Sequence, residues 1–191
     1  MGPSGCGKST FGQLFVPTNI FDGDLVIQRI QASNPEMNSE DVRIKSSMLY
    51  LKLRNEAVEK NLDFALETPF ADNIGIDNIY YFKGLNYSIH GIFFGINSLD
   101  ILLDRIEYRV QEGGHRVTPT NANFNYKYSL LNITSSIQKE LFDKIEFYDT
   151  EDDLKKVAEY SKNGNILSIL DTPHWFNGIR SQLTGWIEEQ L

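Results

Sequence analysis

Apolar positions along the chain follow two kinds of spacing, one typical of helices and one typical of strands. Helical spacing predicts helices over residues 8–16, 39–60, 74–85, 98–112, 123–139, 152–162 and 173–191. Short runs rich in β-branched and aromatic residues predict strands over residues 19–21, 63–67, 87–94, 144–148 and 166–170. Strands that alternate with helices are typical of an α/β fold with a mostly parallel sheet.

Capping and breaking residues support several of these boundaries. Ser39 is a suitable N-cap for the longest helix, and Ser98 is one for the helix at 98–112. Gly113 and Gly114 follow that helix as a stop signal, and Pro17 ends the short helix at 8–16. Several polar residues sit just after predicted strands, which is where open α/β sheets bind their ligands.

Composition narrows the class of protein. The chain has 191 residues, 41% of them hydrophobic, and a net charge of −8. We therefore expect a single globular domain over 1–191, and we do not expect a nucleic-acid partner, because such proteins usually carry a basic face. No apolar run approaches the roughly 20 residues needed to cross a bilayer, so no membrane partner is expected. The lone cysteine, Cys6, cannot form an intrachain disulfide, which fits a cytoplasmic location.

The N-terminal stretch fits the phosphate-loop pattern G-x-x-x-x-G-K-[ST]. Glycines allow consecutive backbone N–H groups to face one phosphate, and the following helix adds its positive N-terminal end. Lys8 is expected to reach the β- and γ-phosphates, and the hydroxyl of Ser9 to bind Mg²⁺. The pattern predicts a site for Mg·ATP formed by Gly2, Pro3, Ser4, Gly5, Cys6, Gly7, Lys8, Ser9 and Thr10.

This pattern normally follows a buried strand, yet only Met1 precedes Gly2. We therefore expect a P-loop three-layer sandwich whose first strand is truncated, or whose place is filled by another segment.

Further motifs follow in a specific order. After the loop come 22–24 (Asp-Gly-Asp), 67–68 (Glu-Thr), and two arginines, Arg105 and Arg109, ahead of 113–115 (Gly-Gly-His). The segments 129–132 (Ser-Leu-Leu-Asn) and 148–149 (Tyr-Asp) continue that order. In residues 1–150 the chain thereby resembles the zeta toxin family of P-loop kinases. The resemblance implies transfer of the γ-phosphoryl group of ATP to a hydroxyl of a small molecule, such as the UDP-amino sugar that zeta toxins phosphorylate, and an antitoxin protein as a partner.

The resemblance also implies roles for acidic and polar residues. Asp24 stands where the family has its catalytic aspartate, and a carboxylate there would accept the proton of the attacking hydroxyl. Asp22 is a substrate contact or simply a turn residue. Glu67 and Thr68 stand where the family has substrate-side and metal-side groups. For Glu67 a solvated strand end is the alternative, but its apolar neighbours in 64–66 favour a functional role.

Basic residues would neutralise the charge that develops during transfer. Arg105 and Arg109 lie one helical turn apart and so share a face, where they contact phosphate or pair with neighbouring acids. His115 shapes the loop that follows or simply packs. Asp149 borders the nucleotide base or caps a helix.

Three departures from the family leave a second interpretation open. Thr118 stands where relatives commonly have proline, and Asn125 and Tyr128 stand where they often have arginine. Arginines that stabilise transition-state charge are worth about 10³-fold or more in rate. The expected lack of a full first strand, together with Asn125 and Tyr128, therefore leaves an alternative to a kinase: a nucleotide-binding regulator, or a degenerate kinase without efficient turnover.

Overall fold

A computed structural model describes residues 1–114 and 116–190. The chain divides into two compact units. Met1–Lys8 and Thr68–Leu191 form the first, which we call the sheet unit, and Ser9–Glu67 form the second, the hairpin unit. The expectation of a single domain over 1–191 stays a prediction.

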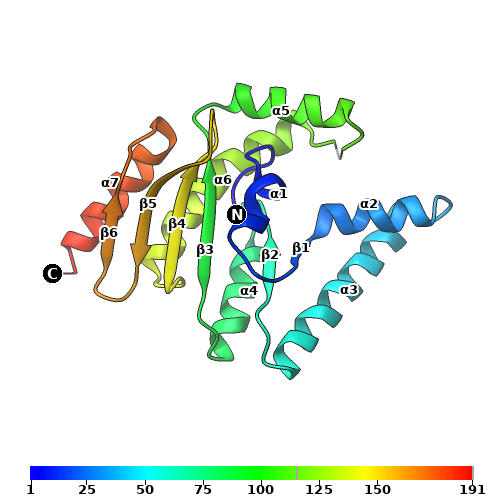
Figure 1. Cartoon of the computed structure of the whole chain (residues 1–191), viewed down its shortest axis with the longest axis horizontal. Coiled ribbons are helices and arrows are strands. Elements are labelled where there is room, and N and C mark those ends of the chain that lie inside the picture. Colours follow the sequence, from blue (N-terminus) through cyan, green and yellow to red (C-terminus); the bar gives the residue numbers. More distant parts are fainter. Residues whose placement is uncertain (115, 191) are drawn as a thin grey trace. The chain divides into compact units, whose positions relative to one another are not determined.

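The sheet unit is built on four strands in the order β3, β4, β5, β6 (Figure 1). β3 pairs in parallel with β4, and the two remaining pairings, β4 with β5 and β5 with β6, are antiparallel. The strands comprise His90–Gly95, Lys144–Asp149, Lys155–Ser161 and Ile166–Ile169, respectively. The predicted α/β class is confirmed.

The helix predicted over 152–162 is wrong, because this segment forms strand β5. A β-bulge explains the misleading pattern. Phe147 pairs with Ala158 and Tyr148 with Lys156, which leaves Val157 as the extra residue. Val157 and Ala158 are therefore both buried, and the alternation that marks a strand is lost.

Four helices complete the sheet unit: α4 (Asn73–Gly84), α5 (Leu99–Gln111), α6 (Pro119–Gln138) and α7 (His174–Glu188). Helices α6 and α7 contact each other and pack against the same face of the sheet (Figure 1). Their apolar faces and those of the strands form one core, which includes Phe93, Phe147, Ile133, Ile137, Trp175, Phe176 and Leu183.

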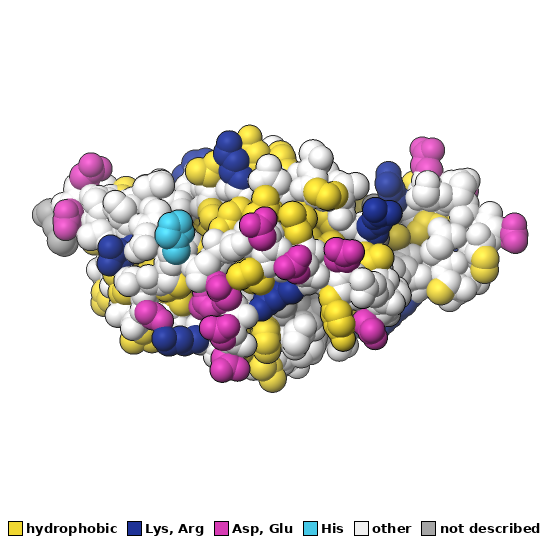
Figure 2. All heavy atoms as spheres, turned by 90° about the horizontal axis from the view of Figure 1, so that it is seen from above, with side chains coloured by type: hydrophobic (Ala, Val, Ile, Leu, Met, Phe, Trp, Pro, Cys, Tyr) yellow, Lys and Arg dark blue, Asp and Glu magenta, His cyan; other side chains and the backbone are white. Residues whose placement is uncertain are grey.

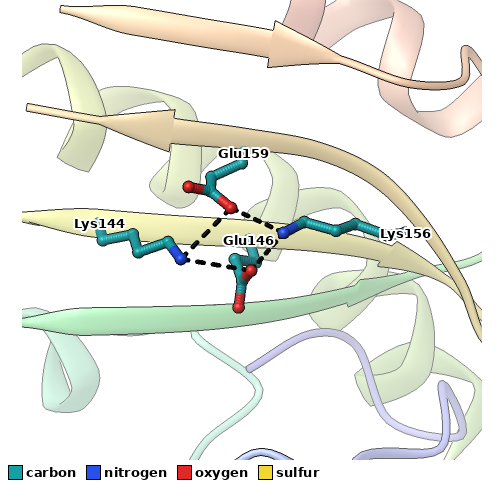
Figure 3. A network of polar contacts seen from close by, with 4 residues as sticks. All are labelled: Lys144, Glu146, Lys156 and Glu159. Carbon is teal, nitrogen blue, oxygen red and sulfur yellow. Dashed lines mark hydrogen bonds and ion pairs between the residues drawn. The ribbon is translucent and has the colours of Figure 1, made fainter.

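Charged side chains of β4 and β5 form a network (Figure 3). Glu146 and Glu159 are direct cross-strand partners, a repulsive arrangement by itself. Lys156 and Lys144 resolve it, because each ammonium forms ion pairs with both carboxylates. Burial works against the charge of Lys156, but hydrogen bonds to the two carboxylates raise its pKa above the ordinary value.

The backbone of Met1 lies along the edge of β3. Its ammonium group donates to Ile92 O at 2.6 Å, and Phe94 N donates to Met1 O at 2.9 Å. This is the hydrogen-bond pattern of a parallel pair of strands. Met1 thus makes, over one residue, the pairing expected of a strand that leads into the loop.

The hairpin unit contains a two-stranded parallel sheet and two helices. Strand β1 (Ile20–Asp22) pairs with β2 (Ala65–Glu67), and α2 (Gly23–Ser33) packs against α3 (Ser39–Glu59). α2 was not predicted, although Asp22 caps it by accepting a hydrogen bond from Leu25 N. The first helix is shorter than predicted: α1 covers Lys8–Phe11, followed by the 3₁₀ turn Gly12–Leu14.

Acidic, basic and hydrophobic side chains are interspersed on the face drawn in Figure 2. Over the described residues, no helix has both the length and the apolar character needed to cross a membrane.

Candidate functional site

The loop Gly2–Gly7 has the backbone that its glycines predict. Gly2, Gly5 and Gly7 have φ values of 133°, 87° and 83°, a region that favours glycine. A Cβ atom at Gly2 would lie 2.2 Å from the carbonyl oxygen of Phe94. The loop is therefore fitted closely against the carboxyl end of β3, and a side chain there would displace it.

Lys8 follows this loop and is buried. Its ammonium donates to Pro3 O at 3.0 Å, and Cys6 N also donates to Pro3 O, at 3.3 Å. The lysine thus folds back over the turn that contains the glycines. A positive charge is held inside the loop, beside a carbonyl oxygen that a phosphate oxygen can replace as its partner.

Thr150, directly after β4, fixes one peptide group of the loop. Its buried hydroxyl lies 2.9 Å from Cys6 O and 3.2 Å from Gly95 O, and its backbone N donates to Gly95 O at 3.1 Å. A trans peptide points its C=O and its N–H in opposite directions. By holding Cys6 O, Thr150 therefore directs the N–H of Gly7 away from its own hydroxyl. Sequence reasoning did not single out Thr150, which is 144 residues from Cys6.

Arg105 and Asp149 both hold the segment around Thr150. The guanidinium of Arg105 donates to Thr150 O at 2.7 Å and Glu151 O at 2.6 Å. The carboxylate of Asp149 accepts from Trp175 Nε1 at 2.7 Å and from Glu151 N at 2.9 Å. These contacts position the loop after β4, and neither side chain is a helix cap. Their predicted contacts with phosphate and base stay predictions.

Asn125 of α6 also reaches the phosphate loop. Its side-chain nitrogen donates to Ser4 Oγ at 2.9 Å. Tyr128, one turn later, stacks on Phe124 at a centroid distance of 4.4 Å. Asn125 therefore supplies a neutral hydrogen bond to the loop at the position where relatives often carry a cation.

The glycine pair after α5 has a purely local explanation. Gly114 N donates to Arg109 O at 2.8 Å, and Gly113 N donates to Val110 O at 3.0 Å. With Gly113 at a φ of 85°, this is the Schellman arrangement that ends helices. A Cβ atom at Gly114 would lie 2.6 Å from Cγ of Arg109, so the glycines also make room for the arginine side chain. The prediction for His115 lies outside the described residues.

Within the hairpin unit, Ser9, Asp22 and Glu67 come together. Asp22 and Glu67 are register partners at the carboxyl ends of β1 and β2. The hydroxyl of Ser9 lies 2.9 Å and 3.1 Å from the two carboxylate oxygens of Glu67, and 3.4 Å from Asp22 Oδ2. Asp22 also caps α2 through its other oxygen, which fits its interpretation as a turn residue, whereas the substrate contact stays a prediction.

These oxygens suit a hard cation. Mg²⁺ is usually held by one or two carboxylates together with phosphate oxygens and waters. The described residues contain no group of three or more histidine, cysteine or acidic side chains arranged to bind a metal, so the donors here are one hydroxyl and two carboxylates.

The other predicted residues are placed as follows. Asp24 is exposed in the first turn of α2, and Thr10 is exposed in α1. Thr68 is buried, and its hydroxyl accepts a hydrogen bond from Phe70 N at 3.0 Å. This bond helps to hold Phe70, a core residue, at its unusual φ of 58°.

Comparison with known sequences gives two relatives. No family model matches the chain. An uncharacterized protein of Haemophilus influenzae is 29% identical over 128 residues, which cover 65% of this chain and 88% of that protein. The phosphate import ATP-binding protein PstB of Malacoplasma penetrans is 35% identical over 86 residues, which cover 41% of this chain and 28% of that protein.

Solved structures with a similar fold include the following two. The AvrRxo1-ORF1:-ORF2 complex contains a chain with a TM-score of 0.69 and 12% identity, and the match covers 98% of this chain and 73% of that one. A structure of the PezAT chromosomal toxin-antitoxin system of Streptococcus pneumoniae gives a TM-score of 0.61 and 14% identity, and covers 100% and 85%. The fold is of the zeta-toxin type.

The zeta-toxin-type fold confirms the resemblance inferred from the motifs. The motifs that carried this resemblance differ in how the structure accounts for them. The glycine-rich loop has three glycines at positive φ with the Lys8 ammonium folded over it, and Ser9, Asp22 and Glu67 bring one hydroxyl and two carboxylates together. The Gly-Gly pair is accounted for by local structure, and Thr68 makes a local hydrogen bond with Phe70 N.

Proposed function

We propose that this protein is an ATP-dependent phosphotransferase of the zeta-toxin type, which moves the γ-phosphoryl group of Mg·ATP to a hydroxyl of a small molecule. The observation that carries the proposal is the loop Gly2–Gly7, with three glycines at positive φ and the buried Lys8 ammonium folded over it. The relationship to PstB, whose name describes an ATP-binding protein, supports ATP as the nucleotide. ATP as donor in turn favours a cytoplasmic location.

Each unit has its own candidates for donor binding. In the sheet unit, backbone N–H groups of the loop and the Lys8 ammonium bind the β- and γ-phosphates. In the hairpin unit, Ser9, Asp22 and Glu67 hold Mg²⁺, either directly or through its waters. When bound, the ion neutralises charge on the phosphate oxygens. Arg109 and Arg105 are the candidates for stabilising the charge that develops on the transferred group.

Asp24 is the proposed base. Its carboxylate accepts the proton of the acceptor hydroxyl as that oxygen bonds to the γ-phosphorus and the bond from phosphorus to the leaving ADP oxygen breaks. An exposed carboxylate in the first turn of α2 is free to meet an acceptor from solution. Glu67 and Thr68 are the further candidates for acceptor contacts. A UDP-amino sugar is the first acceptor to test, since the family resemblance implies it.

A partner protein is part of the proposal. The PezAT structure is described as a toxin-antitoxin system, and the AvrRxo1 structure as a complex of two open reading frames. An antitoxin that binds this chain would be the corresponding partner.

Substitution of Asp24 tests the mechanism. Asp24→Asn is expected to reduce transfer by about 10²-fold or more, while Mg·ATP still binds. Transfer is measured by ³¹P NMR with ATP and the acceptor, and binding by calorimetry with a non-hydrolysable analogue. Asp100→Asn is the matched control, because Asp100 is also an exposed acid in the first turn of a helix. Unchanged transfer by the Asp24 variant would remove this residue from the mechanism.

A nucleotide-binding regulator without turnover is the second candidate. It is favoured by the neutral contact of Asn125 with the loop and by the engagement of Arg105 with two backbone carbonyls. This candidate predicts that Mg·ATP raises the melting temperature although no product forms with any acceptor. Phosphotransfer to even one metabolite at a rate typical of kinases, about 1 s⁻¹ or more, would exclude it.

A further inference from the structure

Helix α3 exposes an unusual amount of apolar surface. Its 21 residues include only three that are buried. Ile44, Met48 and Leu51 are 50%, 65% and 44% exposed, respectively. They are spaced four and three residues apart, so they form one stripe along the helix. Contiguous exposed apolar surface on a folded chain commonly marks a place where another molecule binds.

Basic residues flank this stripe on both sides. At 100° per residue, Lys45 and Lys52 lie on one side of it and Arg43 on the other. Arg54 shares the second side and lies 5.6 Å from the ring centroid of Tyr50. Residues 42–55 contain these four cations and no acid, although the whole chain carries a net charge of −8. An apolar seam between two basic rows is the pattern of a helix that pairs with an acidic partner helix.

We propose that the stripe of α3 is a docking surface for an amphipathic helix of a partner protein, whose apolar seam is flanked by acidic residues. Burial of the stripe would supply affinity, and pairing with the basic rows would supply specificity and a fast association.

The same charges disfavour two other occupants. A second copy of α3 would place basic rows against basic rows, whether the two helices ran parallel or antiparallel. A lipid surface would meet Glu40, which lies one turn before Ile44 on the stripe itself. A carboxylate at that position resists insertion into an apolar phase.

The test uses the full chain and a designed peptide of about four heptads, with leucine at the two seam positions and glutamate at the flanking ones. The control peptide carries lysine in place of glutamate. Binding is measured by fluorescence anisotropy at low and high salt. We expect the glutamate peptide to bind about tenfold or more tightly than the lysine peptide at low salt, with the difference shrinking as salt rises.

The double variant Met48→Asn with Leu51→Asn is expected to weaken binding of the glutamate peptide by about tenfold or more. Both side chains are exposed, so the fold should persist, which circular dichroism checks. Leu170→Asn is the control, since Leu170 is 68% exposed but lies after β6. The proposal would be overturned if the glutamate and lysine peptides bound equally well. It would also be overturned if Leu170→Asn lost as much affinity for the glutamate peptide as the double variant.

Two outcomes would show that the stripe serves another occupant and would equally overturn the proposal. One is binding to anionic vesicles that the double variant loses, with no binding of the glutamate peptide. The other is self-association that the double variant loses, measured by sedimentation. The proposal does not depend on phosphotransfer, so an inactive protein that binds the glutamate peptide would still support it.

Discussion

The two units differ sharply in how much they bury. In the sheet unit, a continuous core joins β3, β4 and β5 to α4, α6 and α7. In the hairpin unit, Val42, Ser46 and Ala57 are the only buried residues. The hairpin unit nevertheless carries large apolar side chains, and those of α3 are mostly exposed. The two units thus have very unequal cores.

This difference bears on where each part of the proposed chemistry lies. The loop that would hold the phosphates is anchored within the sheet unit, through Phe94, Thr150 and Asn125. The acids proposed to bind the cation and the acceptor lie in the hairpin unit. Regions with few buried contacts open at a lower free energy than dense cores. We therefore expect a rigid phosphate loop, and acids for the cation and the acceptor that become ordered when they bind ligands or a partner.

The largest expected effect comes from the core of the sheet unit. Phe176 is fully buried against Phe147, at a ring-centroid distance of 5.2 Å. Phe176→Ala is expected to lower the free energy of unfolding by about 3–5 kcal/mol. Met48→Ala, in the hairpin unit, should change it by no more than about 0.5 kcal/mol, because the side chain is exposed. Urea denaturation of the two variants measures both values.

The fluorescence of the chain allows a sharper version of this measurement. Both tryptophans, Trp175 and Trp186, lie in the sheet unit, whereas circular dichroism reports on helices of both units. If the hairpin unit opens first, the dichroism transition begins at lower urea than the fluorescence transition. Coincident transitions, together with equal amide protection in α3 and in β4, would show that the two units unfold as one.

The next effect concerns the anchor of the phosphate loop. Thr150→Val keeps the shape of the side chain but removes the hydroxyl that holds Cys6 O. Loss of a buried hydrogen bond of this kind is expected to cost about 1–3 kcal/mol of stability. The peptide before Gly7 would lose its fixed orientation, so the affinity for a non-hydrolysable ATP analogue should fall about tenfold, the equivalent of 1.4 kcal/mol.

Thr150→Ser separates this role from simple packing. Serine keeps the hydroxyl and loses only a methyl group. The affinity of this variant for the nucleotide should therefore lie within about twofold of that of the unsubstituted protein, even if some stability is lost. If the valine and serine variants bind the analogue equally well, Thr150 does not position the loop. If both lose affinity equally, the methyl group rather than the hydroxyl is what matters.

Much of the fold follows from local sequence signals. The helices at 39–60, 98–112 and 173–191 and the strands at 87–94 and 144–148 match α3, α5, α7, β3 and β4 to within a few residues. The exceptions have local causes. The bulge at Val157 disguised β5. The helix α2 had its cap in Asp22 and apolar residues at Val26, Ile27 and Ile30, so the signal was present but not used.

The candidate site was only half visible in the sequence. The loop is a contiguous motif, and its glycine backbone is as predicted. The contacts that Thr150 and Asn125 make with the loop join residues more than 120 positions apart, and no periodicity or motif marks such pairs. The contact of Arg105 with Thr150 spans 45 residues and likewise follows no motif, whereas Asp149 accepts from Glu151 N only two positions away, a local contact that was not predicted.

The smallest expected effect is a pH-dependent one, confined to the sheet unit. Asp143 precedes β4 and accepts a hydrogen bond from Ile89 N at 2.7 Å. Burial alone would raise the pKa of this carboxyl group, but the Ile89 N–H and the nearby Lys83 bring it below its ordinary value. A group whose pKa is lowered on folding stabilises the fold above its unfolded pKa of about 3.9 and loses that contribution as pH falls through the lower, folded value.

Asp143→Asn should therefore cost about 1 kcal/mol at pH 7 and almost nothing near pH 2. Asp153→Asn, at an exposed position, should cost little at either pH. A loss for Asp143→Asn that is the same at both pH values would mean that the charge of Asp143 adds nothing to its hydrogen bond. A loss of stability that is seen by circular dichroism but not by tryptophan fluorescence would contradict the assignment of this contact to the sheet unit.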